Sequence, residues 1–389
     1  MGAAGAVVAG LVAVAGLVTA SLAVAAPPSG AWTLTPKQRM AALTAGLHDV
    51  VAAPGGPPGA IAVVQRGSRV LVSTAGVADV ASPGPIGLDD TVRIASVSKA
   101  FSGAVALALV RQKRLALSDT IGQLLPELPE AWHQVTLAQL LRHTSGLPDY
   151  IKSEEFLEVL KKDPLIDLTP LQLLDFVADE GLAPGHGTTY DYSDSDNLVV
   201  GLMVEAVTGG SYASALADLV TTPLGIDHTV LPGDEAMPDP FVHGYSVTPG
   251  SPPEDVTFFL NPALAWASGG MLSTPAELNT FMRAYVRGAF TNPASRRAQF
   301  DFIAGDSGPP GPGTNASGLA LFRYQTSCGT VYGHTGNFPG YTIFAAATSD
   351  GSRSVTVIVN EQLNDNPVTP VFTQLRHVDG LGVCAALQS

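Results

Sequence analysis

Basic residues and cysteine are scarce in this sequence. Lys and Arg number 20 against 34 Asp and Glu, which gives a formal net charge of −14 over 389 residues. Proteins that bind nucleic acid neutralise its phosphates with clustered positive charge, so this balance argues against a nucleic-acid partner. The 41 Gly and 30 Pro stay below the share that marks low-complexity chains, so one large or two modest folded domains are expected.

The two cysteines, Cys328 and Cys384, are too few to suggest a metal centre on their own. A zinc site needs three or four ligands at short spacing, so we expect no metal and no other cofactor. In an oxidising compartment such a pair favours one disulfide, which in the simplest model adds about 4 kcal/mol by restricting the unfolded chain. Two buried free thiols are the alternative.

No charged side chain occurs before Lys37, and residues 3–26 are small or apolar. An Ala-Val-Ala triplet ending at Ala25 has the form of a signal-peptidase site, although the usual basic start is missing. We expect residues 1–26 to be a signal peptide, or an uncleaved anchor, since about 20 apolar residues span a bilayer. Residues 27–35 read as a linker. No later run is long and apolar enough to span, so a secreted or cell-surface location is predicted, with membrane anchoring only through the first segment.

Hydrophobic periodicity indicates sheet-forming ends and a helical middle. Thr35 before Pro36 is typical of a helix start and predicts a helix over 36–51. Beta-rich runs occur at 60–65, 70–75, 318–325, 329–334, 341–348 and 353–360, helical patterns at 96–112, 136–143, 170–178, 196–208, 212–220, 275–287 and 367–379, and a Pro/Gly loop at 305–313.

Strands at both ends of the chain imply one antiparallel sheet assembled from distant segments, with an inserted helical lobe. We therefore predict a single α/β domain of the α+β type over residues 36–389. The sheet lobe would comprise about 36–95 and 290–389, and the helical lobe about 96–289. A cleft is expected between the two lobes.

Several familiar catalytic and metal-binding patterns are missing. No Gly-x-Ser-x-Gly elbow is present, which argues against the α/β-hydrolase architecture. Gly-Asp-Ser-Gly at 305–308 copies the nucleophile motif of chymotrypsin-like proteases, but prolines follow it and no Ala-His-Cys motif precedes it. Asp191, Asp194 and Asp196 hint at a calcium loop, yet the glycine and distal glutamate of that pattern are absent.

A stronger signal is Ser96 followed by Lys99, at the junction of strand-like and helix-like sequence. A spacing of three on a helix places both side chains on one face, so the amine can touch the hydroxyl. The free N–H groups of the helix start can supply half of an oxyanion hole. Alone the pattern is weak, because a capping serine and a solvated lysine occur at this spacing by chance.

Two distant motifs follow in order: Tyr-Asp-Tyr-Ser-Asp at 190–194 and Tyr-Gly-His-Thr-Gly at 332–336. With the Ser-x-x-Lys pattern they resemble the serine penicillin-recognising family, in its branch of D-alanyl-D-alanine carboxypeptidases, class C beta-lactamases and related esterases. The segments 141–147 and 268–274 are similar to two further family segments, and the likeness spans about 40–385. The resemblance implies a beta-lactamase/transpeptidase-like fold.

The resemblance also implies roles for particular residues. Ser96 would be the nucleophile and Lys99 its activating neighbour. Tyr192, poised by Lys99 and His334, would shuttle the proton from the nucleophile to the leaving group. The backbone N–H groups of Ser96 and Asn337 would form the oxyanion hole.

Asp194, Thr335 and Gly336 would contact the substrate by the same resemblance. His143, in the segment 141–147, is interpreted as structural, holding backbone at a helix end. The two cysteines flank the third motif as they do in the secreted carboxypeptidases, which favours their pairing.

The sequence departs from the family pattern in three places. Asp194 stands where the family has Asn, and a carboxylate cannot donate a hydrogen bond to a substrate carbonyl; it would favour a protonated Lys99 instead. Phe322 and Asn337 stand where the carboxypeptidases have an Arg and a hydroxyl that read a terminal carboxylate. Arg323 is next door, but strand alternation turns it to the opposite face.

The second motif can also be read three residues later, because Ser195, Asp196 and Asn197 spell the Ser-Asp-Asn of the class A branch. We choose the Tyr192 register, since His-Thr-Gly rather than Lys-Thr-Gly stands third. In that register a phenol relays the proton, and Ser195 only helps to start a helix.

The resemblance leads us to expect an exported serine hydrolase that forms an acyl ester on Ser96. D-alanyl-D-alanine carboxypeptidase activity on peptidoglycan stem peptides, with penicillin binding, is the first expectation. An esterase or class C-like beta-lactamase of the same fold is the alternative, and a catalytically silent member that binds wall fragments is the third. The expected partners are a peptidoglycan peptide or a small acyl substrate, with beta-lactams as inhibitors or substrates.

Overall fold

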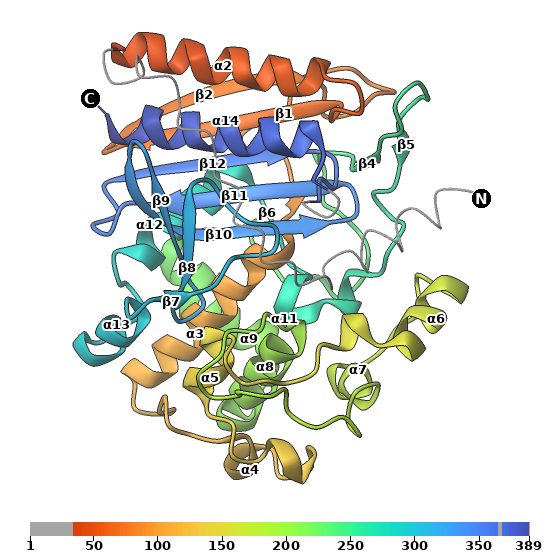
Figure 1. Cartoon of the computed structure of the whole chain (residues 1–389), viewed down its shortest axis with the longest axis vertical. Helices are drawn as coiled ribbons and strands as arrows, with labels where there is room; N and C mark the ends of the chain where they lie inside the picture. The colour runs from red at the N-terminus through yellow and green to blue at the C-terminus, as the bar shows by residue number, and fades with distance from the viewer. Residues whose placement is uncertain (1–33, 365–367, 389) are drawn as a thin grey trace.

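The computed structural model describes residues 34–364 and 368–388, so the predicted leader and most of the linker lie outside the described residues. Within these residues, eight strands form one sheet in the order β2-β1-β12-β11-β10-β9-β8-β7, and every neighbouring pair is antiparallel (Figure 1). The strands are β1 Gly59–Arg66, β2 Arg69–Gly76, β7 Ile303–Ala304, β8 Thr314–Ser317, β9 Phe322–Thr326, β10 Gly329–Phe338, β11 Tyr341–Ala347 and β12 Arg353–Val359.

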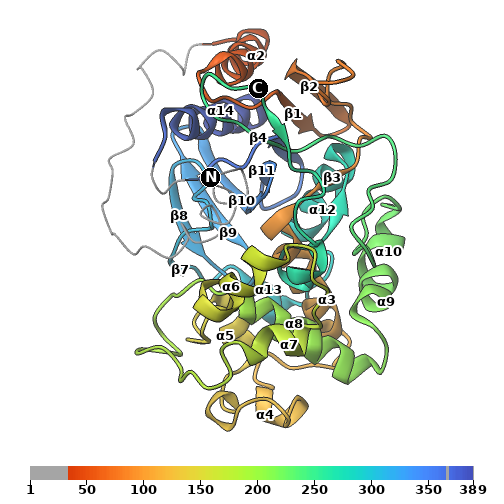
Figure 2. The ribbon, with the colours of Figure 1, turned by 90° about the vertical axis from the view of Figure 1, so that its right-hand side faces the viewer.

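The helices separate into two groups around this sheet. The α-helices are α2 Pro36–Ala52, α3 Ser98–Arg111, α4 Ile121–Leu124, α5 Leu137–Arg142, α6 Glu154–Lys162, α7 Pro170–Asp175, α8 Asp194–Thr208, α9 Tyr212–Leu216, α10 Thr222–Leu224, α11 Trp266–Gly269, α12 Pro275–Val286, α13 Pro293–Gln299 and α14 Pro370–Leu387. The first and last of them, α2 and α14, pack side by side on the sheet, whereas α3 to α11 form a separate helical lobe (Figures 1 and 2). Short strand pairs, β3 Val92–Arg93 with β6 Leu272–Ser273 and β4 Tyr245–Ser246 with β5 Glu254–Asp255, complete the fold.

Two apolar layers hold the molecule together, one on each face of the sheet. Alternate residues of β1, such as Ala62 and Val64, face α2 and α14. Their neighbours Ile61 and Val63 face the core shared with α3 and α12. This two-sided burial explains why β1, β11 and β12 are apolar along nearly their whole length.

The predicted architecture is confirmed, with corrections at several elements. The strand expected at 318–325 begins at Phe322, and β7, β8, α6 and α13 are among the elements that were not anticipated. The closing helix begins at Pro370 and continues to Leu387, whereas the prediction ended it at 379. Gly380 and Gly382 lie within this helix, and a Cβ on Gly382 would lie 2.7 Å from Val355, so this glycine lets α14 sit close to the sheet.

The predicted disulfide is present: Cys328, between β9 and β10, is bonded to Cys384 of α14. It links the turn between β9 and β10, the strand that carries the third motif, to the helix that covers the sheet. No single helix in the described part of the chain is long and apolar enough to cross a membrane; α8 passes such a test only jointly with the 212–224 segment, across an 84° bend.

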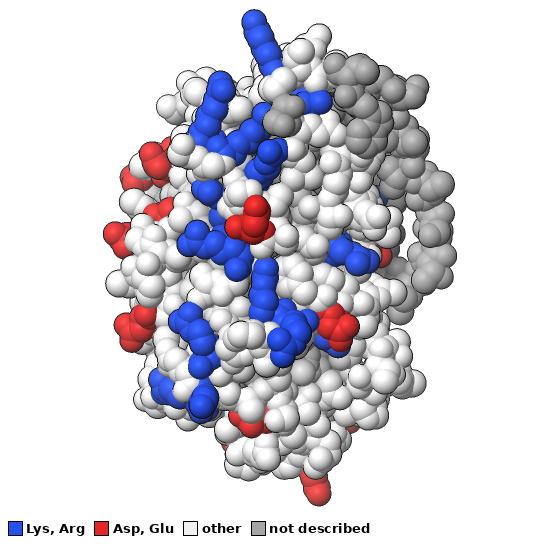
Figure 3. Space-filling view, turned by 90° about the vertical axis from the view of Figure 1, so that its left-hand side faces the viewer, with Lys and Arg blue, Asp and Glu red and all other residues white. Residues whose placement is uncertain are grey.

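Positive charge is unevenly distributed despite the negative total. Lys and Arg gather in a band on one side of the molecule (Figure 3). Arg66, Arg283 and Arg296 on the sheet hairpin, α12 and α13 donate to the backbone carbonyls of Ala385, Gly351 and Ser349. These arginines therefore cap chain ends and turns.

Candidate active site

Strand β10 has two halves with different neighbours. Residues 329–333 pair with β9, and residues 334–338 have no strand on that side among the described residues. The 3-10 turn η3 Ala95–Val97 lies there instead. A Cβ on Gly336 would be 2.5 Å from the Ile94 carbonyl oxygen and 3.2 Å from the Ser96 nitrogen, so only glycine permits this approach. The third motif and the Ser-x-x-Lys motif are therefore in direct contact.

Ser96 lies in η3, two residues before α3 begins at Ser98. Ala95 has a φ of 51°, a left-handed conformation that is strained for a residue with a side chain. The turn is held by the Ser98 hydroxyl, which donates to the Ala95 carbonyl at 2.7 Å, and by Ile94 N–H, which donates to the Met271 carbonyl at 3.1 Å. Ser96 itself is only partly buried, so a substrate can reach it.

Lys99 is fully buried and uses all three of its protons. It donates to Ser96 Oγ at 3.1 Å, to Asp194 Oδ1 at 2.5 Å and to the Ser268 carbonyl at 2.9 Å. Burial alone would lower the pKa of Lys99, but the Asp194 carboxylate outweighs it and raises that pKa. Burial likewise would raise the pKa of Asp194, and Lys99 holds it below its ordinary value. Lys99 is thus an ammonium at neutral pH. It donates to Ser96 and has no lone pair with which to accept the proton of the Ser96 hydroxyl.

Tyr192 lies two residues before α8, with its hydroxyl buried and without a hydrogen-bond partner among the described residues. The Lys99 Nζ is 4.9 Å from the centroid of its ring. Burial raises the pKa of Tyr192, while Lys99 and Ser96 act to lower it. Tyr192 is therefore a neutral phenol close to Lys99 and Ser96. Its oxygen can accept a proton only while it releases the proton that it already carries.

His334 is fully buried on β10, with Nδ1 2.6 Å from the Thr335 carbonyl oxygen. A carbonyl only accepts, so Nδ1 carries the proton and Nε2 is left as an acceptor, with no partner in the described chain. Burial is the main cause that lowers the pKa of His334 to about 3, and Lys99 adds to it. The ring of Phe322 meets it edge-on, with centroids 5.0 Å apart.

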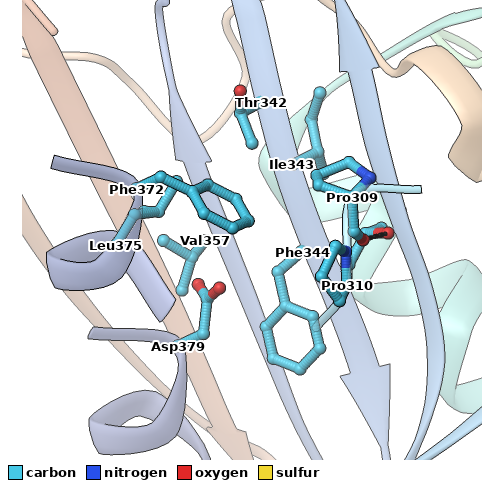
Figure 4. A pocket seen from close by; sticks show the side chains of 10 residues that line it. Pro309, Pro310, Thr342, Ile343, Phe344, Val357, Phe372, Leu375 and Asp379 are labelled. Atoms are coloured by element: carbon cyan, nitrogen blue, oxygen red, sulfur yellow. Dashed lines mark hydrogen bonds between the residues drawn. The ribbon is translucent and has the colours of Figure 1, made fainter. Parts of the chain in front are cut away.

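Thr335 of the third motif and Asn337, just after it, donate hydrogen bonds to backbone carbonyls. The Thr335 hydroxyl donates to the Pro309 carbonyl at 2.6 Å and lines a pocket toward α14, whose near wall carries the Asp379 carboxyl (Figure 4). The Asn337 side chain donates to the Leu363 carbonyl at 3.3 Å. Substrate contact by Thr335 and Gly336, and the oxyanion role of the Asn337 N–H, stay predictions.

In the later register of the second motif, Ser195 and Asn197 form hydrogen bonds within the helical lobe. Ser195 Oγ donates to the Pro148 carbonyl at 2.7 Å, and Asn197 donates to Ser102 Oγ at 2.7 Å. Asp194, in contrast, faces Lys99. The geometry therefore favours the Tyr192 register.

The other competing motifs have structural surroundings. Ser307 of the Gly-Asp-Ser-Gly stretch is buried against the Tyr324 hydroxyl at 3.0 Å. No group of three or more potential metal ligands occurs in residues 34–364 and 368–388.

Sequence reasoning missed Asp149. Its Oδ1 accepts the Asp194 N–H at 3.1 Å, and its Oδ2 lies 3.3 Å from Lys152 Nζ. Burial, followed by the neighbouring Asp194, raises the pKa of Asp149 to about 7. The sequence did offer one signal for Asp149: it lies two residues after Leu147, the last residue of the segment 141–147.

These contacts match a class: serine hydrolases in which a lysine three residues after the serine contacts its hydroxyl, with a tyrosine and a histidine from two other segments. The family model described as Beta-lactamase matches residues 45–378. The chain therefore belongs to the Beta-lactamase family, which confirms the resemblance and the fold.

Curated relatives include two penicillin-binding proteins. One from Bacillus subtilis (strain 168) is 22% identical over 340 residues, which cover 82% of this chain and 72% of that protein. Penicillin-binding protein 4 of Amycolatopsis lactamdurans is 26% identical over 229 residues, 58% of this chain and 54% of that protein. The chain thus spans about half of the second relative.

Solved structures similar to this one include a D-stereospecific amidohydrolase from Streptomyces sp., with a TM-score of 0.73 and 29% identity over 83% of this chain and 94% of that one. D-amino acid amidase from Ochrobactrum anthropi SV3 aligns with a TM-score of 0.76 and 24% identity over 90% and 98% of the two chains. The second likeness shows the fold alone.

Asp194→Asn should change the pH dependence of Ser96 acylation. Without the carboxylate, burial dominates and lowers the pKa of Lys99. Because Lys99 acts as an ammonium, the apparent pKa at which acylation falls off on the alkaline side should decrease by more than about one unit. The measurement is the rate of labelling by a fluorescent penicillin across pH. Asp301→Asn, which removes an exposed ion pair with Arg142, is the matched control. Superimposable profiles for both variants would contradict the assigned role of Asp194.

Gly336→Ala should slow acylation by more than about 100-fold, because the new methyl group forces β10 away from Ser96 and misplaces the reacting groups. Gly380→Ala is the control, since a Cβ there meets no atom within 4 Å. Both proteins should keep the natural circular dichroism spectrum. Full activity in Gly336→Ala would show that the two motifs need not touch.

Proposed function

We propose that this protein hydrolyses amide bonds of peptides or amides that contain D-amino acids, through an acyl ester on Ser96. The observation that carries the proposal is the meeting of Ser96, Lys99 and Tyr192, with the neutral His334 on the adjoining strand. The D-alanyl-D-alanine carboxypeptidase expected from the sequence is one enzyme of this class. An exported location is part of the proposal, and the disulfide supports it, because such bonds persist in oxidising compartments.

In the first step the Ser96 oxygen attacks the substrate carbonyl carbon and forms a C–O bond. The hydroxyl proton passes to the Tyr192 oxygen while Tyr192 gives its own proton to the leaving nitrogen, and the C–N bond then breaks to release an amine. Water hydrolyses the ester by the reverse route and releases the acid. Because Lys99 stays an ammonium, it serves by donating to Ser96 and by stabilising negative charge that develops on Tyr192.

The surroundings of the leaving group distinguish two substrates of this class. Phe322 lies against His334, whereas the Arg323 guanidinium lies over the ring of Phe302 at 5.3 Å from its centroid. A terminal carboxylate would therefore meet an apolar ring where the carboxypeptidases provide an Arg. This favours an uncharged amide as the substrate, as the names of the Streptomyces and Ochrobactrum proteins also suggest.

Ser96→Ala should abolish covalent labelling by fluorescent penicillin and turnover of every substrate, with the fold retained, because a partly exposed hydroxyl at a helix start contributes only about 1 kcal/mol. Ser307→Ala should label normally. Mass spectrometry of the adduct decides between them. An adduct on Ser307 or Ser145, or one that persists in Ser96→Ala, would refute the nucleophile.

The natural protein should hydrolyse a peptide amide that ends in D-Ala-D-Ala-NH2 at least as efficiently as the free acid, since Phe322 stands where the carboxypeptidases provide an Arg. The measurement is kcat/KM for the pair. A preference for the acid of more than about 100-fold would instead identify a carboxypeptidase with another carboxylate reader. Fast turnover of penicillin would mark a beta-lactamase, and activity confined to short-chain esters an esterase.

A further inference from the structure

Behind Tyr192 lies a buried polar cluster that the proposed chemistry does not use. His143 Nδ1 is 2.8 Å from Asp196 Oδ2, and the Ser145 hydroxyl donates to the other oxygen of the same carboxyl. The Ser145 hydroxyl in turn accepts the Leu147 N–H at 3.0 Å. All three polar side chains are at most 2% exposed, so the cluster is part of the helical lobe and not of its surface.

His143 is in contact with Tyr192 through its ring and its backbone. The two ring centroids are 4.4 Å apart with the planes inclined by 35°. The His143 carbonyl also accepts the N–H of Asp191, the residue directly before Tyr192, at 2.8 Å. The ring and the backbone carbonyl of His143 therefore both help to fix the position of Tyr192.

Tyr192 depends on such contacts because hydrogen bonding does not orient it. Its hydroxyl has no hydrogen bond of standard geometry within the described residues, and the Lys99 Nζ lies 4.9 Å from the centroid of its ring. A proton relay works only while the phenol oxygen stays within hydrogen-bond reach of the nucleophile, and a displacement of about 1 Å can cost 100-fold in rate. Something other than a hydrogen bond must hold the ring.

We infer that His143, held by Asp196, is a positioning residue that keeps Tyr192 in line for proton transfer with Ser96. The inference rests on the proposed function and adds to it a residue that touches no substrate. Asp196 belongs to the first turn of α8 and His143 ends α5, so their bond also joins the two helices on either side of Tyr192.

The charge state of the cluster suits this task. Burial, followed by the charge of Lys99, lowers the pKa of His143 to about 3. Burial raises the pKa of Asp196 well above its ordinary value. The His143 imidazole is therefore neutral at neutral pH and places no second cation beside Lys99, whose ammonium faces the Tyr192 ring.

A purely architectural role for His143 is the competing explanation. It is the C-cap of α5 in a left-handed conformation, with φ 56° and ψ 46°. Asn is the suitable replacement, because it tolerates this conformation and its amide can still bond to Asp196 while it removes the ring. His143→Gln serves if Asn impairs folding.

The test is a double-mutant cycle with Tyr192→Phe, read as the acylation rate constant and the binding constant for a fluorescent penicillin. With Tyr192 present, His143→Asn should slow acylation between about 10- and 100-fold and leave binding unchanged within about threefold. In the Tyr192→Phe background the same change should cost less than about threefold, because there is no relay left to misplace. His133→Asn is the control, since His133 lies in the same lobe and bonds to the Leu128 carbonyl.

Equal losses in both backgrounds, or a loss that follows the melting temperature, would show a structural role and overturn the inference. Normal acylation in His143→Asn would do the same. If the natural protein forms no Ser96 adduct at all, the proposed function fails and this inference fails with it. A normal adduct with an additive cycle rejects the positioning role alone.

Discussion

The buried ammonium of Lys99 is the interaction around which the site is arranged. Removing a charge from water costs several kcal/mol, and loss of one partner of a buried pair typically costs about 3–5 kcal/mol. The molecule meets that demand with one acceptor from each of three segments: Ser96 from η3, Asp194 from α8 and the Ser268 carbonyl from α11. Because each acceptor can approach Lys99 only if its own segment is in place, the charge couples the packing of the helical lobe to the position of the nucleophile.

The sheet contributes the other constraint. β10 reaches past the end of β9, and its free half is closed by the turn that carries Ser96. The contact needs Gly336 on the strand and a left-handed Ala95 before the nucleophile. The strain at Ala95 is tolerated because the Met271 carbonyl and the Ser98 hydroxyl hold the turn from both ends.

Much of this was predictable from the sequence, for physical reasons that differ between features. Side chains with a chemical identity at a fixed spacing, such as Ser96 with Lys99, could be found directly. So could the start of α2, because Thr35 and Pro36 are a cap and a first-turn residue whatever the fold. The effect of Asp194 on Lys99 also follows from charge and proximity alone.

Other features leave no trace in the sequence. The third acceptor of Lys99 is a backbone carbonyl, which every residue carries, so nothing marks Ser268 in advance. The bond from Thr335 to the Pro309 carbonyl depends on the path of a loop without periodicity. α14 continues through Gly380 and Gly382 because packing on the sheet outweighs helix propensity, and local patterns do not report such packing.

The order of strands in the sheet has a consequence for biosynthesis. β1 and β2 emerge from the ribosome early, but β1 must wait for β12, and Ser96 must wait for β10, before either has its neighbour. Such non-local pairing is slow, because closing the long intervening loop costs conformational entropy before any stabilising contact has formed. A nascent chain therefore carries Ser96 without the strand that adjoins it, and the proposed hydrolysis can begin only after the last strands have been made and the two lobes have closed on one another.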